Sequence, residues 1–457
     1  MSLIRVLAEV VVDMDFAKLP PAVVEQAKKC ILDYMGNMIG GRYTNKGETI
    51  VNYAASLPCA TDATIIGHGK VAREIAAFTN AALSRMLDLD DGHRFAMGHP
   101  ACVLVPTALA VGEYLEASGP EIINAIVAGY EVYVRIGSTF NPSSYIEKGF
   151  DTTGVCGAVA VAAVAAKLYK LDEEQTKDAL GLAAVHAGGI IEYFSDGSSG
   201  KYLCPGWATS TGIKAAELAR RGFTGPETVL EGNKGYLQAF SNKYDVTRIT
   251  DRPANDYGIL QNYFKIHACV RRLHPAVDAM LALRSKLALN PGKVKAITVK
   301  AGTFVSQANK LHPQALTAAQ VSLPFVLAVA LTHGRVDESS LVQSINDNGI
   351  GEIEKKITII ADPKVQAYAA ANPSNWGAVE VEVLTVDSRR ESQWVPLAFG
   401  EPEAPLSWEM LEDKFAHLIS PTKFAEVADR LINSVKQIDR CQKINEFTEG
   451  LKVPGQA

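Results

Sequence analysis

VCGAVAVAAVAA, residues 155–166, is the most apolar run of the chain and constrains its fold more than any other stretch. The run spans about a dozen residues and is followed by Lys167, so it is too short to cross a bilayer and is typical of a buried helix. Small side chains let helix axes approach closely, and alanine has the highest intrinsic helix propensity. The run therefore predicts a core of tightly packed helices.

Helical spacing extends outward from this run over much of the chain. Up to about residue 250, apolar residues recur at intervals of three and four, and glycine and proline separate the segments. One segment opens at Pro20 and Pro21 and precedes the pair Gly40 and Gly41. The pattern indicates a large all-helical domain. Further helices are expected at residues 71–87, 101–117, 121–136, 155–168, 173–187, 206–221 and 226–230.

Strand patterns enter after Lys265. Residues 294–300 and 378–386 alternate apolar and polar side chains, as half-buried strands do. Residues 275–287 and 322–332 keep a helical spacing. A smaller α+β domain is therefore expected among the helices.

The predicted fold class is mainly α, with two domains, because the chain exceeds the size at which one core stops growing. The helical domain covers residues 1–260 and is completed by residues 400–457, in which Ser407 is suited to cap a helix. The α+β domain covers residues 261–399. Residues 401–405 have the composition of a linker.

Charge and composition exclude several classes of function. Apolar residues make up 47% of the chain and charged residues 21%, so the chain can bury a core. Lys and Arg total 45 against 50 for Asp and Glu, and this net charge of -5 gives no electrostatic reason to expect nucleic acid or a membrane as a partner. Any anion specificity must be local.

The seven cysteines are scattered and never spaced as C-x-x-C, which argues against a disulfide framework and a zinc site. Residues 1–12 contain a short apolar patch interrupted by Glu9 and do not resemble a secretory signal. We therefore expect a cytoplasmic protein without a metal site.

A first cluster of titratable residues contains Asp88, Asp90, Asp91 and His93, followed by His99. Carboxylates beside imidazoles can supply a general base and its orienting partner near neutral pH. A solvated loop with helix-capping aspartates is the alternative.

A second cluster, residues 149–154, places Asp151 at a helix start. Asp and Thr are ordinary N-caps there, and the positive end of a helix also binds anions. Capping alone is the simpler interpretation of this motif.

Two basic clusters follow along the chain. Lys201 belongs to a loop of residues 195–201 that is rich in Gly and Ser and can bind a carboxylate as a point charge, although surface lysines are common. Lys265, His267 and Arg271 lie together at the expected domain junction, where clefts favour ligands. A basic solvated turn is the competing interpretation of this second group.

Familiar cofactor and hydrolase motifs are absent from the sequence. Residues 67–70 look like a phosphate loop but lack the first glycine and the following Ser or Thr. No G-x-G-x-x-G, H-E-x-x-H or G-x-S-x-G occurs in a suitable context. Dinucleotide-binding, zinc-protease and serine-hydrolase functions are therefore not predicted.

Taken in order, several of these stretches resemble the MmgE/PrpD family over nearly the whole chain. No single stretch is diagnostic, but their order and spacing together are specific. The matching pieces are residues 32–36, 80–91, 99–100, 129–132, 149–154, 201–226, Lys265 and residues 400–407.

The resemblance implies a helical domain, a smaller α+β lid, a site between them, a homodimer and a reaction that needs no cofactor. In the family, positions matching Asp88, His99, Lys201 and Lys265 line the site. Asp88 and His99 are then the acid and base candidates, and the two lysines bind carboxylates and assist proton transfer if desolvation lowers a pKa. Asp151 is the fifth catalytic candidate. The expected substrate-binding residues are Asp91, His93, Lys201, Lys265, His267 and Arg271.

The chain departs from the family pattern at several of these places. Family members usually have His at Asp151, Tyr near Phe325 and Thr near Gly92. His is also common where this chain has Arg85 and Cys204. Loss of an imidazole and a phenol changes which groups can donate protons, because a carboxylic acid does so only if its pKa is raised.

The leading functional hypothesis is a lyase for a small di- or tricarboxylate, similar to 2-methylcitrate dehydratase or cis-aconitate decarboxylase. It would abstract a proton beside a carboxylate while cations stabilise the developing charge. An epimerase of a dicarboxylate, similar to iminodisuccinate epimerase, is the first alternative because Asp151 replaces His. A carboxylate-binding protein without catalytic activity is the second.

Overall fold

The computed structural model describes residues 1–251, 253 and 256–452, which form two compact units. The first unit contains Met1–Ile191, Gly200–Tyr263 and Ser407–Ala457. The second contains Glu192–Ser199 and Phe264–Leu406. The first is almost entirely helical and the second combines helices with a sheet, so the predicted mainly α class is confirmed.

The first unit is a helical body with two small two-stranded sheets, β1 with β2 and β3 with β4. Its elements are α1 (Leu3–Asp13), α2 (Pro21–Arg42), α3 (Asn45–Ala55), β1 (Ala63–Ile65), β2 (Gly69–Val71), α4 (Arg73–Ser84), β3 (Gly92–His93), α5 (Ala101–Leu115), α6 (Gly119–Phe140), α7 (Thr152–Leu168), α8 (Glu173–Val185), α10 (Gly200–Arg220), α11 (Tyr236–Phe240), α12 (Thr247–Thr250), β4 (Asn262–Tyr263), α20 (Trp408–Ile419), α21 (Ala428–Lys436) and α22 (Ile444–Glu449).

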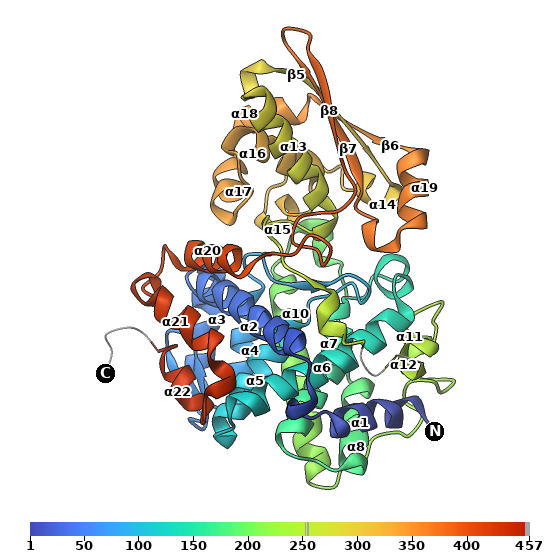
Figure 1. The fold of residues 1–457 in the computed structure, drawn as a ribbon, viewed down its shortest axis with the longest axis vertical. Helices are drawn as coiled ribbons and strands as arrows, with labels where there is room; N and C mark the ends of the chain where they lie inside the picture. Colours follow the sequence, from blue (N-terminus) through green and yellow to red (C-terminus); the bar gives the residue numbers. More distant parts are fainter. Residues whose placement is uncertain (252, 254–255, 453–457) are drawn as a thin grey trace. The chain divides into compact units, whose positions relative to one another are not determined.

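Helix α7 forms the core of this unit and contains the apolar run of residues 155–166. It packs against α5, α6, α8 and α10, and nearly all of its residues are buried (Figure 1). Small residues make this close approach possible. A Cβ atom added to Gly212 of α10 would lie 2.5 Å from Val161 Cγ1 and 2.6 Å from the carbonyl oxygen of Ala158. The alanine-rich sequence is therefore explained by the short distance between helix axes.

Side chains define where several helices begin. Ser118 and Glu121 form a capping box at the start of α6, and each satisfies a backbone N–H that the helix leaves unpaired. Asp151 caps α7, and Ser407 caps α20 as the sequence indicates. These caps fix the register of helices whose apolar faces alone leave their ends undefined.

The C-terminal helices return to the N-terminal part of the chain. Helices α20 and α21 pack on α2, and α22 packs on α5, so the red and blue segments of Figure 1 lie side by side. Lys414 Nζ of α20 binds Asp33 Oδ1 of α2 and donates a 2.7 Å hydrogen bond to the carbonyl oxygen of Leu89. The return thus reaches the loop that contains the first titratable cluster.

The second unit is built on one four-stranded sheet in the order β6, β5, β7, β8. Strands β5 and β6 are parallel, whereas β5 with β7 and β7 with β8 are antiparallel. Buried and half-buried residues alternate along β7, and α13 packs on β7, β8 and α16. Its elements are α9 (Tyr193–Asp196), α13 (His274–Leu287), β5 (Val294–Ala301), α14 (Thr303–Ser306), α15 (Leu316–Ala319), α16 (Leu323–His333), α17 (Glu338–Ser344), α18 (Asn348–Glu354), β6 (Ile357–Ala361), α19 (Pro363–Ala371), β7 (Val379–Thr385) and β8 (Arg390–Val395).

Two local predictions are wrong. Residues 227–230 form a turn rather than a helix, because the segment lies between glycines and its carbonyl groups accept bonds from Gly232 and Tyr236. Helix α10 begins at Gly200, six residues before the expected start. Strands β6 and β8 were not predicted.

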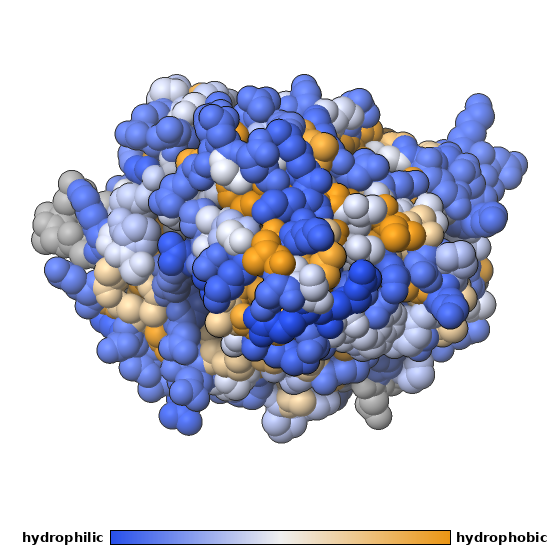
Figure 2. Space-filling model, turned by 90° about the horizontal axis from the view of Figure 1, so that it is seen from above, coloured by the Kyte–Doolittle hydropathy of each residue, from blue (hydrophilic) through white to orange (hydrophobic). Residues whose placement is uncertain are grey.

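The surface in Figure 2 is mainly polar, with apolar side chains in small groups between charged ones. Among the residues that the structure describes, no helix is long and apolar enough to cross a membrane.

The close packing of α7 on α10 predicts the effect of a single methyl group. We expect Gly212→Ala to lower the free energy of unfolding by about 1–3 kcal/mol, because the new Cβ meets backbone that cannot move aside. Gly188→Ala is the matched control, since a Cβ there has no neighbour within 4 Å among the described residues. Urea denaturation of both variants checks this, and equal stability would contradict the packing argument.

Candidate active site

The candidate site lies in the first unit, around the segment that joins α4 to α5. This segment contains Asp88, Asp90 and Asp91, and its strand β3 pairs with β4 in antiparallel register. Asp88 has a positive φ of 55°, a left-handed conformation that aspartate tolerates better than most residues. All three aspartates are buried. The alternative of a solvated loop is therefore wrong.

Gly92 leaves room for a phenol beside this loop. A Cβ atom at Gly92 would lie 2.1 Å from the hydroxyl oxygen of its strand partner Tyr263. The ring thus occupies the space that a side chain at residue 92 would need. The glycine that departs from the family pattern is a packing requirement of Tyr263.

Lys201 forms a buried ion pair with Asp88. The Lys201 Nζ and Asp88 Oδ1 atoms are 2.8 Å apart, and each side chain is 1% exposed. Their attraction is stronger here than in water because little solvent screens it. The sequence indicated a loop at Lys201, but the residue lies in the first turn of α10. Pro205 has no N–H to donate to the Lys201 carbonyl one turn earlier, so α10 lacks that bond.

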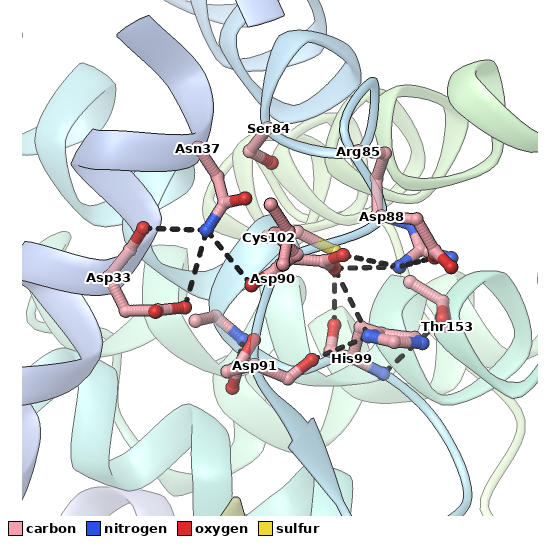
Figure 3. A network of polar contacts seen from close by, with 12 residues as sticks. Asp33, Asn37, Ser84, Arg85, Asp88, Asp90, Asp91, His99, Cys102 and Thr153 are labelled. Carbon is pink, nitrogen blue, oxygen red and sulfur yellow. Dashed lines mark hydrogen bonds and ion pairs between the residues drawn. The ribbon is translucent and has the colours of Figure 1, made fainter. Parts of the chain in front are cut away.

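Arg85 and Asp90 form a second buried pair beside the first. Arg85 Nη1 lies 2.8 Å from Asp90 Oδ1 and 2.7 Å from Asp90 Oδ2, and 4.0 Å from Asp88 Oδ1 (Figure 3). Burial disfavours the charged guanidinium, but the Asp90 and Asp88 carboxylates outweigh it and raise the pKa of Arg85. Arg85 therefore stays a cation inside the cluster.

His99 faces this pair at the start of α5. Its Nδ1 atom lies 3.1 Å from Asp90 Oδ2 and within hydrogen-bond distance of the Asp91 carbonyl oxygen (Figure 3). An ionised carboxylate and a carbonyl only accept, so Nδ1 carries the proton and Nε2 of the neutral ring keeps a lone pair. Two bonds fix the backbone of His99, one from its N–H to Thr153 Oγ1 at 3.3 Å and one from the Cys102 thiol to its carbonyl at 3.1 Å.

Asp91 is held in a network with its own partners. Its Oδ2 atom accepts hydrogen bonds from Tyr130 at 2.9 Å and Asn262 at 2.6 Å. Its Oδ1 atom has no hydrogen-bond partner among the residues that the structure describes. Burial raises the pKa of Asp91 to about 7; the bond from Asn262 opposes this rise, and the charges of Asp90 and Asp33 add to it. Asp91 is thus protonated over part of the neutral range.

The ring of His93 is bound to the backbone on both sides. Its Nδ1 atom accepts from the Ala96 N–H at 3.1 Å, and its Nε2 atom lies 3.2 Å from the Gly258 carbonyl oxygen. This arrangement holds the turn that precedes His99.

Asp151 both caps α7 and belongs to the buried cluster. Its Oδ1 atom accepts from the Thr153 N–H at 2.9 Å, as expected for an N-cap. Its charge also acts on the guanidinium of Arg85. Burial raises the pKa of the neighbouring Cys204 thiol well above its usual value, and Asp151 raises it further. The thiol is therefore a neutral neighbour of the carboxylate.

The other three predicted residues, Lys265, His267 and Arg271, belong to the second unit and are mostly buried there. His267 Nε2 lies 2.8 Å from Asp278 Oδ1, and Arg271 binds Glu401 while stacking 4.7 Å from the Trp376 ring centre. The alternative of a solvated basic turn is wrong for His267, which is 5% exposed.

The residues that complete the cluster escaped prediction as site residues. In the sequence, Arg85 stands out only as a departure from the family, and Asp90 only as one of three neighbouring acids. Their pairing depends on the left-handed turn at Asp88, which has no strong sequence signal. Across residues 1–251, 253 and 256–452, no group of three or more His, Cys, Asp or Glu residues is arranged to hold a metal ion.

Comparison with known protein families identifies the class of protein. Residues 5–249 match the MmgE/PrpD N-terminal domain, and residues 267–440 match the MmgE/PrpD C-terminal domain. The chain belongs to the MmgE/PrpD family, as the sequence resemblance indicated.

Curated relatives span nearly the same length as this chain. The cis-aconitate decarboxylase-like protein oryM of Aspergillus oryzae is 23% identical, over 96% of this chain and 94% of the relative. The cis-aconitate decarboxylase of Aspergillus terreus is 26% identical, over 95% and 93%. The cis-aconitate decarboxylase of Mus musculus is 25% identical, over 95% and 90%. Decarboxylases are lyases, so these relatives support a lyase-type enzyme at the level of the family.

The raised pKa of Asp91 predicts how stability depends on pH. The folded state holds this proton more tightly than the unfolded chain, so its contribution is present below about pH 4 and is lost as pH rises through about 7. We expect a loss of up to about 4 kcal/mol across that window, and Asp91→Asn should lack it.

Urea denaturation at a series of pH values measures this difference. Asp413→Asn, which removes an exposed carboxyl in the same unit, is the control and should follow the parent protein. A parallel pH dependence for the parent and Asp91→Asn would show that Asp91 is ionised in both states.

Proposed function

We propose that this protein is a cofactor-independent lyase that acts on a small di- or tricarboxylate by abstracting a proton beside a carboxylate. The observation that carries this proposal is the buried group in which His99, with its proton on Nδ1, lies among the Arg85–Asp90 and Lys201–Asp88 pairs. The names of the curated relatives support a carboxylate substrate and a lyase reaction.

His99 is the proposed general base. A neutral imidazole with its lone pair on Nε2 can take a proton from a carbon acid near neutral pH. Asp90 stabilises the imidazolium that forms, because its carboxylate already faces Nδ1. In a dehydration, the abstracted proton passes from Nε2 to the departing hydroxyl, which leaves as water. In a decarboxylation no proton is abstracted; protonated His99 instead gives a proton through Nε2 to the carbon that carbon dioxide has left, and the ring regains a proton from solvent.

Lys201 is the proposed carboxylate ligand. Its ammonium group is held by Asp88, and an incoming carboxylate would exchange one anionic partner for another. The cation then stabilises the negative charge that develops on the substrate when the proton or carbon dioxide leaves. Lys265, His267 and Arg271 of the second unit are proposed as further ligands, and Asp91 and His93 as supports of the loop that binds the substrate. A homodimer is part of this proposal.

An epimerase of a dicarboxylate is the second candidate, and Asp151 favours it. Epimerisation needs two groups that exchange a proton on opposite faces of one carbon. Asp151 is a buried carboxylate whose charge acts within the same cluster as His99, so the two could serve as that pair.

Removal of the proposed base tests the function. His99→Asn keeps a donor near the position of Nδ1 and deletes the atom that takes the proton, so we expect kcat to fall by about 10²–10⁴-fold with the fold intact. The assay follows unsaturated product and carbon dioxide from 2-methylcitrate, citrate and cis-aconitate. Lys214→Ala, which removes an exposed cation of α10, is the control. Binding of these acids to the parent protein without any turnover would instead support a carboxylate-binding protein.

Isotope exchange distinguishes the two candidate reactions. If the protein is a lyase, the Asp151→Asn variant should still exchange hydrogen at the substrate carbon, because His99 performs that exchange. The variant should also still form product in D₂O. For an epimerase, deuterium should enter recovered substrate without elimination, and Asp151→Asn should stop inversion while His99 still exchanges one stereoisomer. Mass and NMR spectra of the recovered acid give both readouts.

A further inference from the structure

We infer that Arg85 and Asp90 form a positioning pair for His99, in which Asp90 fixes the ring tautomer and the permanent charge of Arg85 limits how strongly the ring holds its proton. The inference deepens the proposed function, since it assigns how the base of that reaction is tuned. It goes beyond the family resemblance because Arg85 stands where a titratable imidazole is common.

One carboxylate oxygen links the Arg85 guanidinium and the His99 imidazole. Asp90 Oδ2 lies 2.7 Å from Arg85 Nη1 and 3.1 Å from His99 Nδ1, and Asp90 Oδ1 lies 2.8 Å from the same Arg85 nitrogen. The guanidinium and the imidazole therefore compete for the charge of one aspartate. A change in either partner must alter the attraction felt by the other.

The tautomer follows from the acceptors around Nδ1. The Asp90 carboxylate and the Asp91 carbonyl oxygen both face this atom, and neither can donate to it. A proton on Nε2 would leave Nδ1 against two acceptors in a buried site. The geometry thus keeps the reactive lone pair on Nε2 without help from the substrate.

The strength of the base follows from the charges near it. Asp90 favours the imidazolium, and Arg85 opposes it by neutralising Asp90. Arginine does not lose its proton at any working pH, so this opposition is constant, whereas a histidine at residue 85 would release it as pH rises. The two charges are buried, so salt screens their effect little.

Other titratable groups face the same cluster and stay unchanged in the test. Asp88 and Asp91 belong to the same loop as Asp90, and Cys102 contributes from α5. The cluster is also faced by Tyr133 of α6, by Asp151 at the start of α7, and by Lys201 and Cys204 of α10. Asp33 of α2, which is itself paired with Lys414, faces Asp90. Lys201 and Asp88 neutralise one another. The balance between Asp90 and Arg85 then sets how tightly the His99 ring holds its proton.

Single substitutions at the two positions should move the ring titration in opposite directions. Arg85→Gln removes the opposing cation, so the midpoint should rise by about one pH unit. Asp90→Asn removes the anion that stabilises the imidazolium, so the midpoint should fall by about the same amount. The acid limb of the pH profile of kcat/KM should shift with each midpoint, because the base must be neutral to act.

Nitrogen-15 NMR of the His99 ring in the full chain measures both the tautomer and the midpoint. Arg73→Gln is the matched control, since Arg73 also pairs with an aspartate, Asp62, at 3.0 Å. It should leave the His99 titration in place. A purely structural ion pair would lower stability in both variants without opposite shifts, and that result would overturn the inference.

The outcomes separate this inference from the proposed reaction. Opposite shifts of the ring with no turnover of any acid would retain the positioning pair and reject the lyase. Turnover of an acid would retain the lyase, and it would reject the positioning pair if the ring midpoints of the two variants stay in place or move in the same direction. If neither single variant folds, the ring of the parent protein decides, since a proton found on Nε2 in the neutral form overturns the inference and one on Nδ1 supports it.

Discussion

The ion pair between Lys201 and Asp88 is the interaction on which the rest of the site depends, because it places two opposite charges 2.8 Å apart inside a helical body. Removing either partner takes the close counter-ion from a buried charge, at a cost of about 3–5 kcal/mol. The pair also joins two distant parts of the chain, the loop after α4 and the first turn of α10. The attraction between the two charges holds the left-handed turn at Asp88. The position of this turn then sets where Asp90 and Asp91 lie.

Close packing around α7 makes this arrangement rigid. The alanines and glycines of α7 and α10 bring the two helix starts, with Asp151 and Lys201, into one buried region. Larger side chains at positions such as Gly212 would separate the helices and with them the charges. The same residues that build the core therefore position the chemistry, and stability and function are coupled through helix spacing.

Much of the fold follows from local sequence pattern. The apolar run of residues 155–166 gave the central helix, and Ser407 gave the start of α20, because spacing and capping are local signals. The strand at residues 294–300 also agrees with β5. Strand β6 was missed because its neighbours on the sheet, and not its own alternation, define it. The turn at residues 227–230 was missed because its carbonyl groups accept hydrogen bonds from Gly232 and Tyr236, which follow it in the chain.

The sequence indicated some members of the candidate site, but not Arg85 or Asp90 and not the contacts that join the members. Asp88, His99, Asp151 and Lys201 carry family patterns, and the structure brings them into one unit. The role of Arg85 depends on the left-handed conformation of Asp88, three residues later, which composition cannot show. The need for glycine at residue 92 is equally hidden in the sequence, because it arises from the ring of Tyr263 and not from a turn of the Gly92 backbone.

The contact of Lys414 with Asp33 and with the Leu89 carbonyl has a consequence for synthesis on the ribosome. A nascent chain presents the loop of residues 85–99 more than three hundred residues before Lys414 emerges to hold it. Until then Asp33 lacks the Lys414 ammonium group, and the Leu89 carbonyl oxygen has only the hydrogen bond from Asn37 and not the one from Lys414. Translation must therefore pass Lys414 before these contacts in the polar centre of the first unit can form, which leaves the loop accessible to chaperones while the intervening residues are made.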